Sequence, residues 1–135
     1  MKIFLAEDNP ADVYLLRQAL GVQTGSEIEL LVAQDGEEAM EYVNRKGRFC
    51  GLPRPDLIVL DLNLPKTDGS DILRAVRESN ELREVPVVIL TSSDSPRDRA
   101  TAERLGADGY ITKPSDLDAF LSLGSILRAY AVVRG

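Results

Sequence analysis

The stretch Asp56-Leu57-Ile58-Val59-Leu60-Asp61 decides the fold, because four apolar residues stand in a row directly before an acid. A continuous apolar run of this length is typical of a parallel strand that is covered on both faces. An acid that follows such a run is costly to desolvate unless something pairs with it. We therefore expect a buried strand at Asp56–Leu60 and a carboxylate with a special role at Asp61.

Four other segments of the chain are predicted to be strands. They are Lys2–Glu7, Glu27–Ala33, Pro86–Thr91 and Gly109–Thr112. The first and the third of these contain continuous apolar runs, whereas Glu27–Ala33 half alternates between polar and apolar residues, which suits the edge of a sheet.

Helical segments with recognisable first residues lie between these strands. Asn9-Pro10, Ser95-Pro96 and Ser115-Asp116 fit helix-capping patterns, and Gly36 and Gly69 open two further amphipathic segments. Five strand-then-helix units in a row predict an α/β fold with a parallel sheet between two helix layers, as a single domain over residues 1–135. The pattern alone leaves the strand order open.

The composition excludes several classes of function. The net charge of −6 disfavours nucleic acid as the main partner, and no apolar run approaches the roughly 20 residues that span a membrane. The single cysteine, Cys50, allows no internal disulfide and fits the cytoplasm. The chain has no histidine, which removes histidine-based nucleophilic catalysis and most catalytic zinc sites. It also means that the chain cannot itself be a phosphohistidine donor.

Polar side chains follow the predicted strands at the point where each strand ends. They are Glu7 and Asp8, Asp61, Thr91 and Lys113. Because ligands bind beyond the carboxyl ends of parallel strands, we expect these side chains to meet at one rim. All of them except Glu7 also have a structural interpretation: Asp8 as a helix cap, Asp61 as a purely structural acid, Thr91 as an ordinary strand residue, and Lys113 as the partner of a structural ion pair.

Three neighbouring carboxylates repel one another, and one lysine balances only part of their charge. A divalent cation with oxygen ligands would complete the balance, and Mg²⁺ prefers such a set with waters or phosphate in the remaining positions. The sequence therefore predicts a magnesium-dependent phosphoryl-transfer site.

These residues, in this order and spacing, resemble the receiver domains of bacterial two-component response regulators. The resemblance covers essentially the whole chain and also includes Leu64-Pro65, Gly69 and the segment Ala107-Asp108-Gly109-Tyr110-Ile111-Thr112-Lys113-Pro114. The segments Ala6–Asp12 and Asp61–Pro65 further resemble stand-alone regulators that partner phytochrome-type histidine kinases. Glu7 departs from the many family members that have aspartate there, which suggests an altered metal geometry.

The resemblance implies a flavodoxin-like (βα)5 fold with strand order 2-1-3-4-5 and a role for each site residue. Asp61 would accept the phosphoryl group from a histidine kinase and Lys113 would pair with it. Asp8, Asp61 and the carbonyl of Asn63 would bind Mg²⁺, with Glu7 holding a metal-bound water. Thr91 and Tyr110 would form the switch pair, and the Lys113–Pro114 bond would be cis. Such a protein is not an enzyme, since it catalyses only its own phosphorylation and dephosphorylation.

The sequence argues against three other interpretations. A phosphatase of the haloacid-dehalogenase type needs a second acid two residues after the nucleophile, where this chain has Asn63. A nucleotide or flavin binder would need a glycine-rich phosphate loop after a strand, and the chain contains neither common form of it. An interaction module with an inactive site would not need the complete set of site residues.

The last predicted helix has two apolar stripes. Leu117, Phe120, Leu121, Gly124 and Leu127 suit the core, and Leu123, Ile126, Tyr130 and Val133 fall on the opposite side. Because a surface helix needs only one buried stripe, the second predicts a homodimer or partner interface. The chain ends soon after this helix, so we expect no attached DNA-binding domain and output through contacts of the domain itself.

The segment 44–55 is long for a connection between a helix and a strand. It contains Arg45, Lys46, Arg48 and Arg54 in an otherwise acidic chain. A solvated loop and a partner-contacting loop both remain open at this point.

Overall fold

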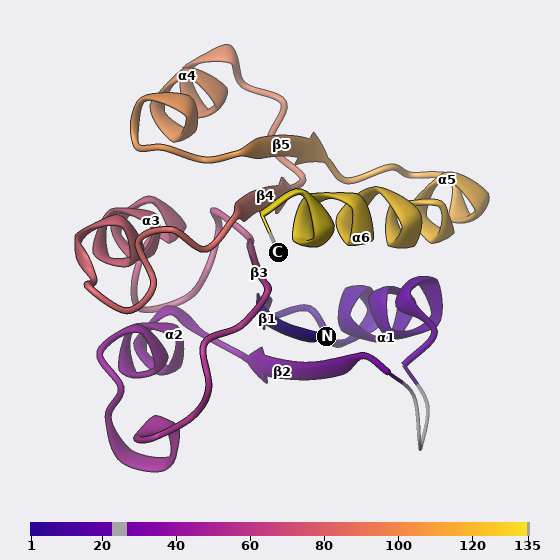
Figure 1. The fold of residues 1–135 in the computed structure, drawn as a ribbon. Helices are drawn as coiled ribbons and strands as arrows, with labels where there is room; N and C mark the ends of the chain where they lie inside the picture. The colour runs from indigo at the N-terminus through magenta and orange to yellow at the C-terminus, as the bar shows by residue number, and fades with distance from the viewer. Residues whose placement is uncertain (23–26, 135) are drawn as a thin grey trace.

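The computed structural model describes residues 1–22 and 27–134, and for residues 132–134 it describes the backbone alone. A parallel sheet forms the centre of the molecule, with strand order β2-β1-β3-β4-β5 (Figure 1). The strands are β1 (Lys2–Ala6), β2 (Glu29–Ala33), β3 (Leu57–Leu60), β4 (Val87–Thr91) and β5 (Gly109–Thr112). The predicted fold class and strand order are confirmed.

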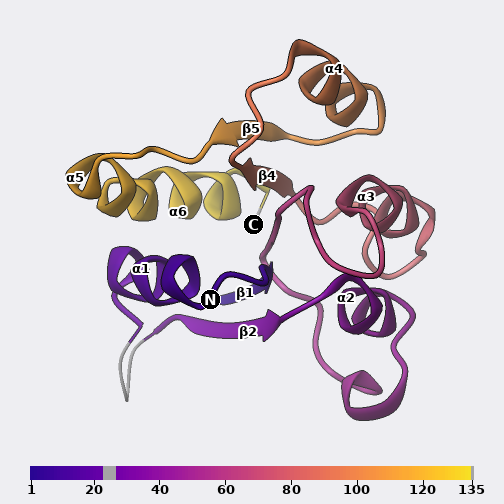
Figure 2. The same ribbon diagram turned by 180° about the vertical axis from the view of Figure 1, so that it is seen from behind.

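Helices cover both faces of the sheet, as Figures 1 and 2 show from opposite sides. On one face lie α2 (Gly36–Val43), α3 (Gly69–Glu78) and α4 (Pro96–Arg104), and on the other lie α1 (Pro10–Leu20), α5 (Leu117–Leu121) and α6 (Leu123–Arg134). A short 3-10 helix, η1 (Gly47–Phe49), lies between α2 and β3.

The central strands are buried because alternate side chains enter two separate hydrophobic cores. In β3, Ile58 and Leu60 pack with α2 and α3, whereas Leu57 and Val59 pack on the side of α1 and α6. All four side chains are buried, which explains why the strand is apolar without alternation. Burial of this kind holds the residue after the strand, Asp61, at a fixed place on the rim.

The helices begin where their capping residues predict. Asn9 accepts hydrogen bonds from the backbone N–H groups of Ala11 and Asp12, with Pro10 as the first residue of α1. Ser95 caps α4 in the same way through Asp98 N. In the last predicted capping pattern the cap is Asp116 and not Ser115, a shift of one residue.

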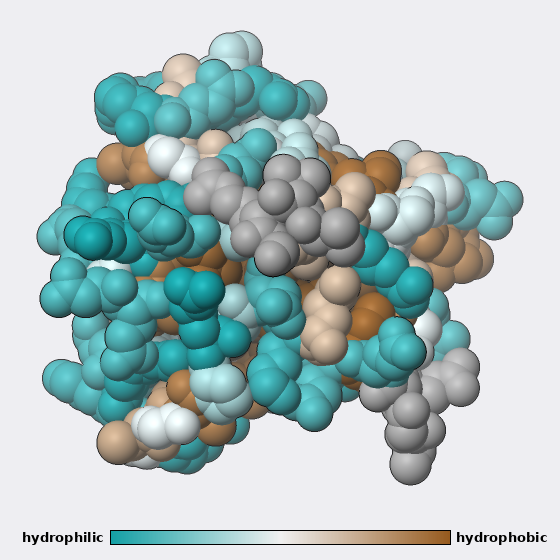
Figure 3. All heavy atoms as spheres, in the orientation of Figure 1, coloured by the Kyte–Doolittle hydropathy of each residue, from teal (hydrophilic) through white to brown (hydrophobic). Residues whose placement is uncertain are grey.

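The prediction for the last helix is only partly correct: Phe120 and Leu127 are buried as predicted, but other residues of both predicted stripes are not where they were expected. The helical region is divided at Ser122 into α5 and α6, so one helical wheel does not describe both parts. Leu123, predicted to be on the outer stripe, is 3% exposed, whereas Leu117, predicted to be in the core, is 55% exposed. In Figure 3 hydrophobic residues reach the surface in the region of α5.

The other residues of the predicted outer stripe are only partly exposed as predicted. Ile126 is 44% exposed, but Tyr130 is half-buried and packs against the core on the α1 side. The side chain of Val133 lies outside the described residues. Gly124 faces inward as predicted: a Cβ there would lie 1.9 Å from the carbonyl oxygen of Ala19, so α6 packs directly on the backbone of α1.

The segment 44–55 is anchored to the rest of the molecule. Phe49 is buried and lies edge-on to Tyr42, whose ring stacks on Phe4 with 3.7 Å between centroids. Arg45 donates to Glu81 and to the carbonyl of Leu52. The segment is therefore anchored at Arg45 and Phe49, while Lys46, Arg48 and Arg54 are exposed, as a solvated loop predicts.

Every peptide bond in the described ranges is trans, including the bond between Lys113 and Pro114. The predicted cis bond is therefore wrong. Proline reduces the preference for trans to about 0.5–1 kcal/mol without reversing it, so the residue type alone permits both isomers. Across residues 1–22 and 27–134, none of the helices has the length and apolar character needed to cross a bilayer.

Candidate functional site

The carboxyl ends of four strands meet at one rim of the sheet. The register pairs Ala6 of β1 with Leu60 of β3, Leu60 with Ile89 of β4, and Thr91 of β4 with Thr112 of β5. The polar residues that end or follow these strands therefore lie side by side. The structure brings Glu7, Asp8, Asp61, Thr91 and Lys113 together as the sequence predicts.

Asp61 is 4% exposed, and each of its two carboxylate oxygens accepts a hydrogen bond. Oδ1 accepts the backbone N–H of Asn63 at 3.1 Å, and Oδ2 accepts from Lys113 Nζ at 2.9 Å. Burial alone would raise the pKa of this carboxyl, but the Asn63 N–H and the Lys113 ammonium outweigh burial and lower it below the ordinary value. Asp61 is therefore ionised at neutral pH.

The backbone behind Asp61 requires a glycine at the start of α3. A Cβ on Gly69 would lie 2.3 Å from the carbonyl oxygen of Asp61 and 2.7 Å from Leu62 Cα. Asp68 caps the helix through Ser70 N, and Gly69 N donates to the carbonyl of Leu62. The turn after β3 is thus folded tightly against the helix that follows it.

Lys113 is the cation at the centre of the site. Its Nζ lies 2.7 Å from Glu7 Oε1, 2.8 Å from Asp12 Oδ2 and 2.9 Å from Asp61 Oδ2. Burial acts to lower the pKa of the ammonium, but the three carboxylates more than offset burial, so the pKa is raised. Lys113 therefore stays charged throughout the physiological range.

Glu7 is 1% exposed, and burial raises its pKa from 4.5 to about 7. The hydrogen bond from Lys113 opposes the shift, while the nearby charge of Asp61 adds to it. The second oxygen, Oε2, accepts the backbone N–H of Asn9 at 3.2 Å. Glu7 therefore lies in a buried site whose cation and N–H donor only partly offset the loss of hydration.

The acidic residues fit a divalent cation. Glu7, Asp8 and Asp61 each offer a carboxylate oxygen, and these oxygens all lie within 4.8 Å of one another. Asp8 is exposed, so one side of the cluster is open to solvent. Hard oxygen donors with an open side suit Mg²⁺ or a similar ion. The carbonyl of Asn63 remains a predicted fourth ligand.

The backbone of Ser93 connects Thr91 and Tyr110, the predicted switch pair. Thr91 is fully buried, and its Oγ1 accepts from Ser93 N at 3.3 Å and from Asn63 Nδ2 at 3.5 Å. The hydroxyl of Tyr110 donates to the carbonyl of Ser93 at 3.0 Å. The guanidinium of Arg99 lies 4.6 Å from the centre of the Tyr110 ring.

Sequence analysis missed two residues of this site, Asp12 and Ser93. Asp12 lies in the first turn of α1, the helix that follows β1. Its position near the end of a strand could therefore have indicated that it lies at the same rim. Ser93 stands two residues after Thr91, and its contacts depend on the path of the loop before α4, which no local pattern reveals.

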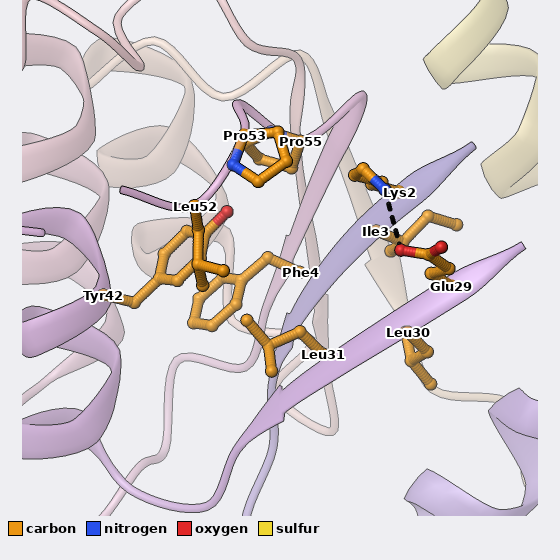
Figure 4. Close-up of a pocket in the computed structure, with 10 residues that line it drawn as sticks. All are labelled: Lys2, Ile3, Phe4, Glu29, Leu30, Leu31, Tyr42, Leu52, Pro53 and Pro55. Atoms are coloured by element: carbon orange, nitrogen blue, oxygen red, sulfur yellow. Dashed lines mark hydrogen bonds and ion pairs between the residues drawn. The ribbon is translucent and has the colours of Figure 1, made fainter. Parts of the chain in front are cut away.

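An apolar pocket of about 250 Å³ lies at the opposite end of the sheet. Its walls come from the first residues of β1 and β2, from α2 and from the segment before β3; Figure 4 shows Tyr42, Phe4, Leu31 and Leu52 around it, with the Lys2–Glu29 ion pair at its edge. It is separate from the acidic rim, because strands begin at one end of the sheet and the rim is where they end.

Comparison with known proteins decides the family. Residues 3–123 match the response regulator receiver domain. This chain is a receiver domain. The resemblance on which the site roles were predicted is therefore confirmed at the level of the family.

Solved receiver domains from phytochrome systems are similar over nearly the full length. The phosphorylated cyanobacterial phytochrome response regulator RcpA is 38% identical, with a TM-score of 0.89 over 98% of this chain and 94% of that one. The Mn²⁺-bound form of the response regulator Rcp1 is 34% identical, with a TM-score of 0.86 over 96% of this chain and 92% of that one.

The curated relatives differ in how much of their length this chain covers. Rcp1 from a Synechocystis species is 38% identical over 115 residues, which are 85% of this chain and 78% of Rcp1. The transcriptional regulatory protein TrcR from Mycobacterium tuberculosis is 40% identical over 129 residues, which are 95% of this chain and 46% of TrcR. The receiver domain thus spans about half the length of that transcriptional regulator.

Proposed function

We propose that this receiver domain accepts a phosphoryl group on Asp61 from a histidine kinase, in a Mg²⁺-dependent reaction, and signals through protein–protein contacts in the cytoplasm. The observation that carries the proposal is the Asp61 carboxylate, buried at the rim and flanked by Lys113 and an acidic cluster with the spacing of a metal site. On this proposal the chain modifies only itself and is not an enzyme acting on other substrates.

The chemistry needs little beyond positioning and charge. An oxygen of Asp61 forms a bond to phosphorus while the bond from phosphorus to the donor's imidazole nitrogen breaks. Lys113 and the Thr91 hydroxyl lie close to Asp61 and are suited to contact the oxygens of the transferred group. Such positioning and neutralisation account for most of phosphoryl-transfer catalysis.

Glu7, Asp8 and Asp61, with the carbonyl of Asn63, would hold Mg²⁺. When bound, the ion would neutralise charge on the acids and on the phosphoryl oxygens. The Mn²⁺ in the Rcp1 structure supports a divalent cation at this rim. The longer side chain of Glu7 reaches Lys113 directly, which leaves its metal contact to be made through a water, as the resemblance implies.

The switch would act through Thr91, Ser93 and Tyr110. A hydrogen bond donated by the Thr91 hydroxyl to the phosphoryl group, about 1.5–3 kcal/mol for a charged acceptor, would replace the one that it now makes with Asp61. The movement of the hydroxyl would loosen the bonds that Oγ1 accepts from Ser93 N and Asn63 Nδ2. A shift of Ser93 would then move the acceptor of the Tyr110 hydroxyl. The NMR shifts of the Tyr110 ring should change on phosphorylation and change less in Thr91→Ala; an equal change in both proteins would contradict this route.

The partner is proposed to be a phytochrome-type histidine kinase, because RcpA is a phytochrome response regulator and is similar over nearly the whole chain. The homodimer predicted for the last helix is retained on the side chains that are exposed, namely Leu117, Leu121 and Ile126. Ile126→Glu should shift the sedimentation coefficient toward that of a monomer. A wild-type chain that sediments as a monomer at all concentrations would remove the homodimer proposal.

The decisive experiment is incubation with acetyl phosphate and Mg²⁺, followed by intact-mass measurement. The expected result is one added phosphoryl group on the wild-type chain and none on Asp61→Asn, which keeps the size of the side chain and removes the nucleophile. Addition to both proteins, or to neither under any donor, would overturn the proposal. Chelation of divalent ions should abolish the reaction of the wild-type chain.

A further inference from the structure

Asp12 is a carboxylate of the site that the proposed chemistry does not use. It lies in the first turn of α1, and its Oδ2 accepts from Lys113 Nζ at 2.8 Å. Its side chain is 18% exposed, and that of Lys113 is 12% exposed, so the bond is partly shielded from water. Asp12 does not belong to the cluster of Glu7, Asp8 and Asp61 that fits a metal.

Lys113 has no donor to spare in this arrangement. An ammonium carries three N–H donors, and three carboxylates from Glu7, Asp12 and Asp61 lie within 2.9 Å of Nζ. An oxygen of an incoming phosphoryl group is a fourth acceptor. Lys113 can therefore bind that oxygen only after one of the three carboxylates has released its N–H.

Of the three carboxylates that bind Lys113, Asp12 requires the least free energy to displace. Glu7 and Asp61 are almost fully buried, and each has a further role at the site. Asp12 is the most exposed of the three acids, so its released carboxylate can be hydrated. It also stands at the positive end of α1, where a negative charge remains stabilised without the lysine.

We propose that Asp12 is a positioning residue that holds the third N–H of Lys113 in the resting state and yields it to the phosphoryl group. The inference rests on the proposed function, since it assumes that Asp61 is phosphorylated. It makes Asp12 a competitor of the phosphoryl donor for Lys113. The carboxylate also adds a negative charge beside the path of an anionic donor, which acts in the same direction.

The inference is tested by the second-order rate constant for phosphorylation by acetyl phosphate at saturating Mg²⁺, followed by intact mass. In Asp12→Asn the competing hydrogen bond is no longer charged, so the rate constant should rise about five- to tenfold, the effect of weakening one partly exposed charged hydrogen bond. Asp12→Glu restores the charge and should return the rate constant toward the wild-type value.

A merely structural role of Asp12 predicts the opposite sign, because a misplaced Lys113 would slow the reaction. The matched control is Asp118→Asn, the same change in the first turn of α5 at an exposed acid, which should leave the rate constant unchanged. A rate constant for Asp12→Asn at or below the wild-type value would overturn the inference alone. A wild-type chain that takes up no phosphoryl group would overturn the proposed function, and this inference with it.

Discussion

Asp61 keeps its place because the chain turns back on itself within eight residues and α3 begins directly behind it. Gly69 makes this possible, since any Cβ there would overlap the carbonyl oxygen of Asp61. Two other glycines differ in kind: Gly47 and Gly51 have open space around them but positive φ values of 57° and 78°. Gly69 is thus required for space, whereas Gly47 and Gly51 serve backbone conformation.

Gly69→Ala should therefore destabilise the fold by about 3 kcal/mol, at the upper end for overpacking, because backbone and not a flexible side chain must move. It should also slow phosphorylation of Asp61. Gly51→Ala, the control, should cost about 1–2 kcal/mol from the left-handed conformation alone and leave phosphorylation unchanged. Urea unfolding measures both costs, and equal effects of the two variants on phosphorylation would contradict the steric argument.

Single residues also show where sequence analysis succeeds and where it stops. Asp61 and Lys113 follow strands, so the strand pattern alone places them at the rim. Asp12 and Ser93 were missed because their roles depend on which side chain lies across from them: Lys113 is 101 residues from Asp12 along the chain. Local patterns predict position on an element, and they do not predict partners between elements.

At the scale of the element, α2 depends on a charged cap that makes its stability sensitive to acid. Asp35 accepts the N–H of Glu38 at 2.8 Å, and this bond, with a smaller contribution from Lys66, lowers the pKa of the Asp35 carboxyl below 3.8 despite partial burial. Because the folded-state pKa is the lower one, the stabilisation is present above about pH 3.8 and is lost as the pH falls through the folded-state value.

Asp35→Ala should therefore cost about 1 kcal/mol at neutral pH, and the difference from wild type should shrink in strong acid. Asp35→Asn keeps a capping oxygen without the charge, so it should retain most of the stability at neutral pH and lose the dependence on acid. Urea unfolding at several pH values provides the test. A difference between wild type and Asp35→Ala that grows on acidification would contradict the argument.

Helix beginnings were predictable because a cap and the N–H groups it binds lie within four residues. The complete burial pattern of α5 and α6 was not predictable in the same way. It is set by the interruption at Ser122 and by the close contact of Gly124 with Ala19 on α1, which is a tertiary interaction. The exposed apolar residues of this region consequently include Leu117 and Leu121 of α5 and, among the described side chains of the predicted outer stripe, only Ile126.

At the scale of the whole molecule, the site forms only when several strand–helix units of the chain have folded together. Lys113 follows β5, and its three partners come from the residue after β1, from α1 and from the residue after β3. The alternation of strands and helices predicts the layers but is compatible with several strand orders. The order 2-1-3-4-5 came from the family resemblance, and it is this order that places β1 beside β3 and their acids side by side.

Lys113→Ala should accordingly destabilise the whole domain by about 3 kcal/mol without divalent ions, because it leaves Glu7, Asp12 and Asp61 with uncompensated negative charge. Mg²⁺ should restore much of this loss, since an ion bound to the folded state alone supplies the missing positive charge. Urea unfolding of wild type and variant, with and without excess Mg²⁺, gives both quantities.

The control for this prediction is Lys66→Ala. Lys66 also bridges two acids, Asp35 and Glu37, each at 3.3 Å, but its side chain is mostly exposed. Its removal should cost much less stability than the removal of Lys113, because exposed ion pairs are screened by water, and Mg²⁺ should not change that cost. If both lysine variants lost the same stability and responded equally to Mg²⁺, the acidic rim would not be the source of the effect, and the charge balance on which the phosphoryl site depends would have to be explained in another way.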